Sequence, residues 1–184
     1  MENLPGSHRM KATLTSMPLT EADLIEHLVI KAKDNLLSGA RPFAALLLKD
    51  GEIIAQGVNR VAADCDPSAH AEMQAIRAAA KSLETTQLDG AVLYASGHPC
   101  PMCLAAALMA GIREIRYVFD NHDAEFCGFS SEASYGLLGL ESQKLAQSPG
   151  FTIRRCQSSF EPAWLYGALA HDAQANPTGD SEEQ

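Results

Sequence analysis

Two short segments of the chain carry side chains that could hold a metal ion and move a proton. One is His-Ala-Glu at residues 70–72, and the other is Pro-Cys-Pro-Met-Cys at residues 99–103. Together they supply one imidazole, two thiols and one carboxylate. A structural zinc site is closed by four protein ligands, whereas a catalytic site keeps one position for water. The pattern therefore predicts three zinc ligands and a carboxylate, Glu72, that does not bind the ion.

The spacing within the segments favours this division of roles. Cys100 and Cys103 stand at i and i+3 of a predicted helix, so both sulfurs can face one ion. His70 and Cys100 both lie where a helix is predicted to begin, and the helix dipole there favours thiolates. Glu72 follows His70 too closely for both to bind the ion from one helical turn. A carboxylate beside a zinc-activated water can instead take its proton and pass it on, which indicates hydrolytic deamination of an amidine-like carbon.

A closed structural zinc site is the alternative for the same ligands. Cys65 or Cys127 would then complete a set of four with His70 and the two cysteines of the second segment. That arrangement gives Glu72 no role, and the catalytic interpretation is therefore favoured.

The composition narrows the class of protein. The chain has 184 residues, 46% of them apolar, and a formal net charge of −9, which suits one globular domain with a full core. This charge disfavours a surface that follows nucleic-acid phosphates, and no apolar run is long enough to span a membrane. The five cysteines do not suggest a disulfide framework. We expect a cytoplasmic protein with a small-molecule substrate and neither a nucleic-acid nor a membrane partner.

Hydrophobic periodicity predicts helices and strands that alternate after an initial hairpin. Helices are expected at residues 24–37 after an N-cap at Thr20, and at residues 68–83, 101–110 and 161–171. In the second helix the inward residues are expected to be Met73, Ile76, Ala80 and Leu83. Strands are expected at residues 43–49, 52–58, 91–96, 114–119 and 151–156. Residues 59–67 and 120–134 are predicted as loops, the second followed by a short helix or turn. This order predicts an α/β fold with a mixed sheet covered on both faces.

The expected domain organisation is a single zinc domain over residues 19–172. Residues 1–18 are expected to be a disordered leader, and residues 173–184 a disordered acidic tail. No internal repeat or linker interrupts the domain between Thr20 and His171.

From about Arg41 to Trp164 the chain resembles the cytidine-deaminase-like superfamily, and within it the bacterial-type guanine deaminases and their nucleoside-deaminase relatives. The matching residues are 42–45 (Pro-Phe-Ala-Ala), 50–51 (Asp-Gly), Asn59, 66–72 (Asp-Pro-Ser-Ala-His-Ala-Glu), 99–103 and 128–129 (Gly-Phe). The order H-x-E and then P-C-x-x-C marks zinc nucleobase deaminases. The resemblance implies a three-layer α/β/α fold with a five-stranded mixed sheet, and a homodimer. It also implies one Zn²⁺ per chain on His70, Cys100 and Cys103, with Glu72 as proton shuttle.

The resemblance also implies a set of substrate contacts. Phe43 would stack on a purine, Asn59 would hydrogen-bond the edge of its ring, and the backbone N–H of Ala71 would meet a substrate carbonyl. Core packing is the alternative role for Phe43, and a turn position after the strand is the alternative for Asn59.

The chain departs from the family pattern in three places. Guanine deaminases usually carry an acid shortly after the Gly-Phe pair, whereas here two serines follow it before Glu132. Asp123 or Glu132 is our candidate for this second substrate-binding acid, with a solvated loop position as the alternative. His98 stands where relatives often have Glu or Ser, and it either shapes the pocket or is a bystander. No aromatic residue follows Tyr166, so the aromatic that some members donate from a swapped C-terminus is missing.

The leading functional prediction is a zinc-dependent deaminase of a small aminated heterocycle, with guanine as the first candidate. A different base or nucleoside, such as cytosine, an adenine-like base, a triazine or a pterin, is the nearest alternative. Adenosine deamination in tRNA is a further alternative, which the acidic charge disfavours. The last alternative is a non-catalytic binding protein that zinc merely stabilises.

Overall fold

The computed structural model describes residues 19–141, 144 and 149–167. The expected leader at residues 1–18 and the expected tail at residues 173–184 lie outside these described residues. The end of the last predicted helix also lies outside them, although residues 162–167 are helical as expected. Within the described part of the chain, no helix is long and apolar enough to cross a membrane.

A mixed five-stranded sheet forms the centre of the fold, as predicted. Its strands are β1 (Ala44–Lys49), β2 (Glu52–Val58), β3 (Val92–Gly97), β4 (Glu114–Phe119) and β5 (Thr152–Arg155). They lie in the order β2-β1-β3-β4-β5, with β1 antiparallel to both of its neighbours and β3, β4 and β5 parallel to one another. Because β2 and β3 run in the same direction, the segments that follow them emerge at the same edge of the sheet.

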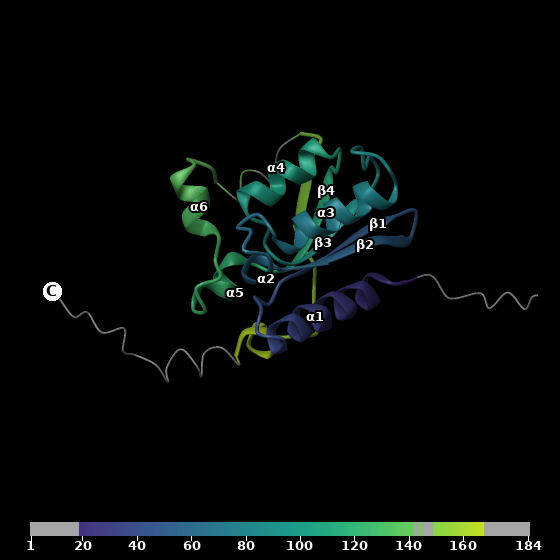
Figure 1. Ribbon diagram of the computed structural model, residues 1–184. Coiled ribbons are helices and arrows are strands. Elements are labelled where there is room, and N and C mark those ends of the chain that lie inside the picture. Colours follow the sequence, from purple (N-terminus) through teal and green to yellow (C-terminus); the bar gives the residue numbers. More distant parts are fainter. Residues whose placement is uncertain (1–18, 142–143, 145–148, 168–184) are drawn as a thin grey trace, which may run out of the picture.

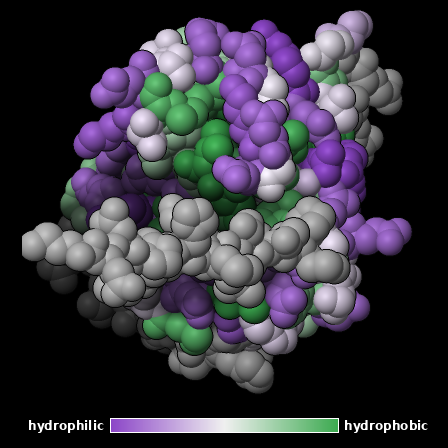
Figure 2. Space-filling view, turned by 90° about the vertical axis from the view of Figure 1, so that its right-hand side faces the viewer, coloured by the Kyte–Doolittle hydropathy of each residue, from purple (hydrophilic) through white to green (hydrophobic). Residues whose placement is uncertain are grey.

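Helices cover both faces of the sheet, which confirms the expected three layers (Figure 1). Helix α1 (Glu21–Leu37) lies on one face, and α3 (Ala71–Ser82) and α4 (Pro101–Met109) lie on the other. The Thr20 side chain and the Asp23 carboxylate cap the start of α1 reciprocally. On the side of the molecule shown in Figure 2, hydrophilic residues surround a central hydrophobic area.

Helix α3 differs from its prediction in both its start and its inward face. It begins at Ala71 rather than Ser68, because His70 is its N-cap and has extended backbone. Its buried residues are Ala71, Glu72, Ala75, Ile76 and Ala79, whereas the predicted inward residue Leu83 is 46% exposed. The reason is close packing on β2: a Cβ at Gly57 would lie only 2.2 Å from the Ala71 carbonyl oxygen. Small alanines permit that approach, and larger residues further round the helix do not.

The two segments predicted as loops contain short helices. Residues 59–67 include α2 (Val61–Asp64), and residues 120–134 include α5 (Asn121–Glu125) and the start of α6 (Glu132–Leu137). Local polar contacts form the first two: Arg60 pairs with Asp64 at 2.6 Å beside α2, and Asp120 and Asp123 cap α5 reciprocally. Helices as short as α2 and α5 show no apolar periodicity, and for that reason the sequence pattern did not predict them. The short helix or turn predicted after residue 134 corresponds to α6, which begins slightly earlier, at Glu132.

Candidate zinc and substrate site

The three predicted metal ligands meet where α3 and α4 begin. His70 is the N-cap of α3, Cys100 is the N-cap of α4, and Cys103 lies in the first turn of α4. Cys100 Sγ lies 3.5 Å from His70 Nδ1 and 3.6 Å from Cys103 Sγ. Cys103 Sγ lies 3.7 Å from His70 Nδ1. The donor atoms therefore form a nearly equilateral triangle.

This triangle fits a zinc ion. Tetrahedral zinc with Zn–S near 2.3 Å and Zn–N near 2.0–2.1 Å sets two sulfurs roughly 3.8 Å apart and a sulfur and a nitrogen roughly 3.6 Å apart. Among the described residues, His70, Cys100 and Cys103 are the group of metal-binding side chains that converges on one point. Cys65 and Cys127 do not join them, so the described part of the chain gives no fourth ligand for a closed structural site.

The charge of the ligand set also suits a divalent cation. Hydrogen-bond contacts with Cys103 and with His70 lower the pKa of Cys100 to about 4. The contact with Cys100, together with burial, raises the pKa of Cys103. The contact with Cys100 also raises the pKa of His70. The Cys100 thiolate thus lies at the N-terminus of α4, where the helix dipole stabilises negative charge.

Glu72 lies beside the metal ligands without being one of them. It occupies the first turn of α3, its side chain is 7% exposed, and it belongs to the lining of a cavity shared with His70 and Cys100. Burial raises the pKa of its carboxyl group. Because burial favours the protonated form of this carboxyl group, the group is suited to both accepting and releasing a proton.

The cavity has a volume of about 410 Å³ and two walls of different origin. We call the starts of α3 and α4, residues 70–72 and 100–103, the metal wall. We call residues 128–138, which lead into α6 and form it, the outer wall. The lining residues of the outer wall are Gly128, Phe129, Ser130, Ser131, Ser134 and Leu138. A substrate in the cavity would lie between a reactive surface and a surface of hydroxyl and apolar groups.

The structure places the predicted contacts Phe43 and Asn59 in the cavity lining, whereas Ala71, between His70 and Glu72, is not among the lining residues. Phe43 lines the cavity, where its ring meets Phe129 edge to face with centroids 5.8 Å apart. Asn59 lines it too, is 3% exposed, and accepts a hydrogen bond from the Val61 N–H through Oδ1 at 3.2 Å. Ala71 is the first residue of α3, where a backbone N–H has no acceptor within its own helix. Their substrate roles stay predictions.

The structure does not bring Asp123 or Glu132 to the cavity lining. Asp123 accepts a hydrogen bond from the Asp120 N–H at 2.9 Å and pairs with Arg155 at 2.6 Å. The Glu132 carboxylate accepts a hydrogen bond from Asn121 Nδ2 at 2.9 Å. In this conformation both acids stabilise the segment that leads to the outer wall, and a direct substrate role for either stays a prediction.

Sequence reasoning missed Tyr135, which joins the two walls. Its hydroxyl group donates a hydrogen bond of 2.5 Å to the carbonyl oxygen of Pro99, beside the ligand Cys100. Its ring is fully buried and packs edge to face against His98, with centroids 5.7 Å apart. The available signal was an aromatic residue in a segment that also contains Phe126 and Phe129, and the sequence does not reveal its partner.

His98 lies in the cavity lining as well, so it is not a bystander. Its ring packs against Tyr117 with centroids 4.7 Å apart, and its Nδ1 lies 3.1 Å from the Pro99 carbonyl oxygen. Burial lowers the pKa of its imidazole.

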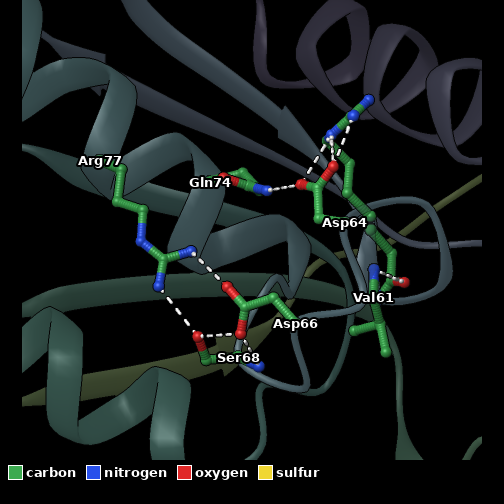
Figure 3. A network of polar contacts seen from close by, with 8 residues as sticks. Val61, Asp64, Asp66, Ser68, Gln74 and Arg77 are labelled. Carbon is green, nitrogen blue, oxygen red and sulfur yellow. Dashed lines mark hydrogen bonds and ion pairs between the residues drawn. The ribbon is translucent and has the colours of Figure 1, made fainter.

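A network of polar contacts fixes the loop that carries His70 (Figure 3). Asp66 accepts hydrogen bonds from the Ser68 N–H at 2.8 Å and from the Ser68 hydroxyl at 2.7 Å. Arg77 on α3 reaches back to Ser68 Oγ at 3.0 Å, and Gln74 on α3 donates to Asp64 at 3.2 Å. The loop is therefore hydrogen-bonded to α3, the helix that follows it. These contacts set the position of the His70 imidazole, since His70 lies between the loop and the helix.

Comparison with known proteins places this site in a family. The model of the cytidine and deoxycytidylate deaminase zinc-binding region matches residues 20–119. Guanine deaminase of Bacillus subtilis is 47% identical over 94 residues, which are 51% of this chain and 60% of that protein. A tRNA-specific adenosine deaminase of Aquifex aeolicus is 40% identical over 85 residues, which are 46% of this chain and 56% of that protein. These matches thus span little more than half of either relative.

The solved structure of Bacillus subtilis guanine deaminase is similar over a longer stretch. It matches with a TM-score of 0.61 at 32% sequence identity, and the match covers 90% of this chain and 100% of that one. The structural similarity therefore covers a larger share of the chain than the residues of the family model.

Proposed function

The chain belongs to the cytidine and deoxycytidylate deaminase zinc-binding family, and from that premise we propose that it hydrolyses guanine to xanthine and ammonia. The observation that carries this proposal is the triangle of His70, Cys100 and Cys103 with the buried Glu72 beside it. Guanine is the proposed substrate because the similarity to a guanine deaminase is seen in both sequence and structure. The cavity volume is in the lower part of the range of roughly 300–1,000 Å³ usual for small-molecule sites.

The residues of the metal wall divide the chemistry between them. Zinc held by His70, Cys100 and Cys103 would act as a Lewis acid that lowers the pKa of water to about 7. Glu72 takes the proton of the attacking water and passes it to a ring nitrogen of the purine. The same carboxyl group then delivers a proton to the departing amine. Its burial supports this role, because a raised pKa lets it hold a proton between the two transfers.

The remaining groups orient the purine. Phe43 would contact its flat face, since the ring is already held against Phe129 on one side and close to Gly97 on the other. Asn59 would hydrogen-bond the ring edge. The N–H of Ala71, which has no acceptor in its own helix, would donate to the carbonyl oxygen of the base.

Adenosine deamination in tRNA is the second candidate, because a tRNA-specific relative is 40% identical over 85 residues. The charge argues against it. A formal net charge of −9 repels the phosphate backbone that a tRNA enzyme must bind.

The test is an ammonia-release assay of the purified zinc-loaded protein. The panel contains guanine, guanosine, cytosine, adenine, a triazine, a pterin and tRNA. We expect guanine to give the highest kcat/KM, and we expect release to stop when a chelator removes zinc and to return when zinc is restored. Release from tRNA alone would replace the proposal by the second candidate. A zinc-loaded protein that releases ammonia from none of these compounds would contradict both.

A further inference from the structure

His98 is a cavity residue that the proposed proton transfers do not use. Its imidazole ring is held from three directions: by Tyr117, by Tyr135 and by the carbonyl group of Pro99. Two of these contacts are edge-to-face ring contacts, which fix the plane of the imidazole as well as its place. The ring is thus presented to the cavity in one orientation.

The contact with Pro99 determines which nitrogen carries the proton. A carbonyl oxygen can only accept a hydrogen bond, so Nδ1, at 3.1 Å from it, must be the donor. The neutral ring then has its lone pair on Nε2. No described residue forms a hydrogen bond with Nε2. In the described part of the chain, the Tyr166 hydroxyl is the one buried side-chain polar atom without a partner. Nε2 is therefore not sealed in the protein but open to the cavity that His98 lines.

The other side-chain acceptors of the cavity lining already have roles. Asn59 Oδ1 accepts from the Val61 N–H, and the proposed contact with the ring edge uses its remaining hydrogen-bonding capacity. Glu72 carries protons in the proposed reaction. The candidate acids Asp123 and Glu132 do not line the cavity. Apart from the serine hydroxyls of the outer wall, His98 Nε2 is the side-chain acceptor left for an N–H group of a substrate.

We infer that His98 is a specificity-determining residue whose Nε2 accepts a hydrogen bond from a ring N–H of the purine. The inference deepens the proposed function and rests on it. Guanine has a ring N–H on its six-membered ring and another on its five-membered ring. The second is replaced by the sugar in guanosine and in RNA. A fixed acceptor thus supplies, without a buried negative charge, recognition of the kind expected of a second acid.

The test compares wild-type protein and His98→Phe on guanine and on 1-, 7- and 9-methylguanine. Phe keeps the ring contacts with both tyrosines but has no acceptor. For the wild type, methylation at one of these nitrogens should raise KM at least about tenfold, which corresponds to 1.4 kcal/mol. In His98→Phe, KM for guanine should rise about tenfold. The variant should then have the same KM for guanine and for the methylated base that the wild type binds poorly. The value of kcat should change less than KM, and zinc content should not change.

Two further variants separate recognition from structure. His98→Gln, whose side-chain oxygen can accept, should restore part of the affinity for guanine. Tyr117→Phe keeps the ring against His98 and should leave all four KM values unchanged.

Three results would overturn the inference. The first is a wild-type enzyme whose KM is the same for all three methylated bases as for guanine. This measurement needs no variant. The second is a His98→Phe enzyme with the KM and methyl penalties of the wild type. The third is a zinc-loaded wild type without activity on guanine, which would also remove the proposed function. The first two leave the proposed function intact.

Discussion

The metal wall and the outer wall face the same cavity but are held by the fold in different ways. The metal wall rests on the sheet: α3 approaches β2 to backbone contact at Gly57, and Cys103 is fully buried. The outer wall is held by fewer contacts: the Tyr135 ring is buried in the core and its hydroxyl bonds Pro99, Phe129 packs against Phe43, and the Ser131 N–H bonds Asn121 Oδ1 at 3.1 Å. Its Leu137 is 91% exposed.

The comparison with the family follows the same division. The matched residues 20–119 contain the whole metal wall and none of the outer wall. In a tightly packed surface any shift of the metal ligands disturbs the core. Such a surface can hold its ligands in the same place, and so keep the same reaction, while other parts of the protein change. A surface held by a few contacts, with other residues such as Leu137 exposed, can change its lining at little cost in stability. We therefore expect changes in the metal wall to alter the reaction and changes in the outer wall to alter substrate affinity.

The largest effect is expected for Glu72→Gln. The amide cannot take up a proton, so kcat should fall about 10²–10⁴-fold, the usual contribution of general acid–base transfer. The fold and the zinc content should be retained, because Glu72 is not a metal ligand. Ammonia release and metal analysis on the same sample measure both. Glu125→Gln, an exposed change in α5, is the matched control and should keep wild-type activity. Normal turnover by the Glu72 variant would refute the proton-transfer role.

The next effect is the loss of zinc from Cys100→Ser. A serine hydroxyl is a poor substitute for a thiolate, and loss of a direct ligand should exceed the 10–100-fold loss of affinity typical for the groups that support ligands. We expect zinc binding to weaken by more than about 100-fold in competition with a chromophoric chelator. Cys65→Ser, outside the ligand triangle, should bind zinc as the wild type does. Equal occupancy in both variants would contradict the ligand assignment.

The metal wall could be predicted from sequence because its information is local. His70 and Glu72 are two residues apart, Cys100 and Cys103 are three apart, and each pair is placed by the start of one helix. Strands β1 and β3 were predictable for a similar reason, since each is a short, mostly apolar run between turn residues.

The outer wall could not be predicted, because its position depends on contacts distant in sequence. Nothing in the sequence pairs Tyr135 with Pro99 or places the serines of residues 130–134 opposite the ligands. The inward face of α3 was missed on similar grounds. The pattern favours large apolar residues such as Leu83, whereas Gly57 on another element makes the small alanines the buried ones.

A smaller effect is expected for Tyr135→Phe, which removes the hydroxyl between the walls but keeps the buried ring. The lost hydrogen bond is worth about 1 kcal/mol, so the melting temperature should fall by a few degrees. Because α6 is then less firmly placed, KM should rise several-fold while kcat and zinc content stay near wild type. Thermal unfolding and steady-state kinetics measure these quantities. A fall in kcat with unchanged KM would mean that the outer wall takes part in the reaction itself.

The smallest effect is expected for the two acids near the outer wall. Asp123→Asn removes the charge that faces Arg155, and this should cost about 0.2–1 kcal/mol of stability, as for other partly exposed pairs. Glu132→Gln keeps an oxygen that can accept from Asn121, so it should change stability less. For both variants we expect KM for guanine within about twofold of wild type, because neither side chain lines the cavity.

Glu132→Gln gives the sharper answer of the two, since its helix also presents Ser134 and nearby Leu138 to the cavity. Glu132→Gln removes the charge and keeps the shape of the side chain. A large effect on KM would therefore mean that, in the wild type, α6 turns and brings the Glu132 carboxylate onto the bound base. In that event the KM of Glu132→Gln for guanine would rise tenfold or more at unchanged zinc content. For a purine without the N–H group that donates to the Glu132 carboxylate, wild type and variant would have the same KM. Such a result would show that the outer wall closes on its substrate, and that a carboxylate shares the recognition assigned to His98.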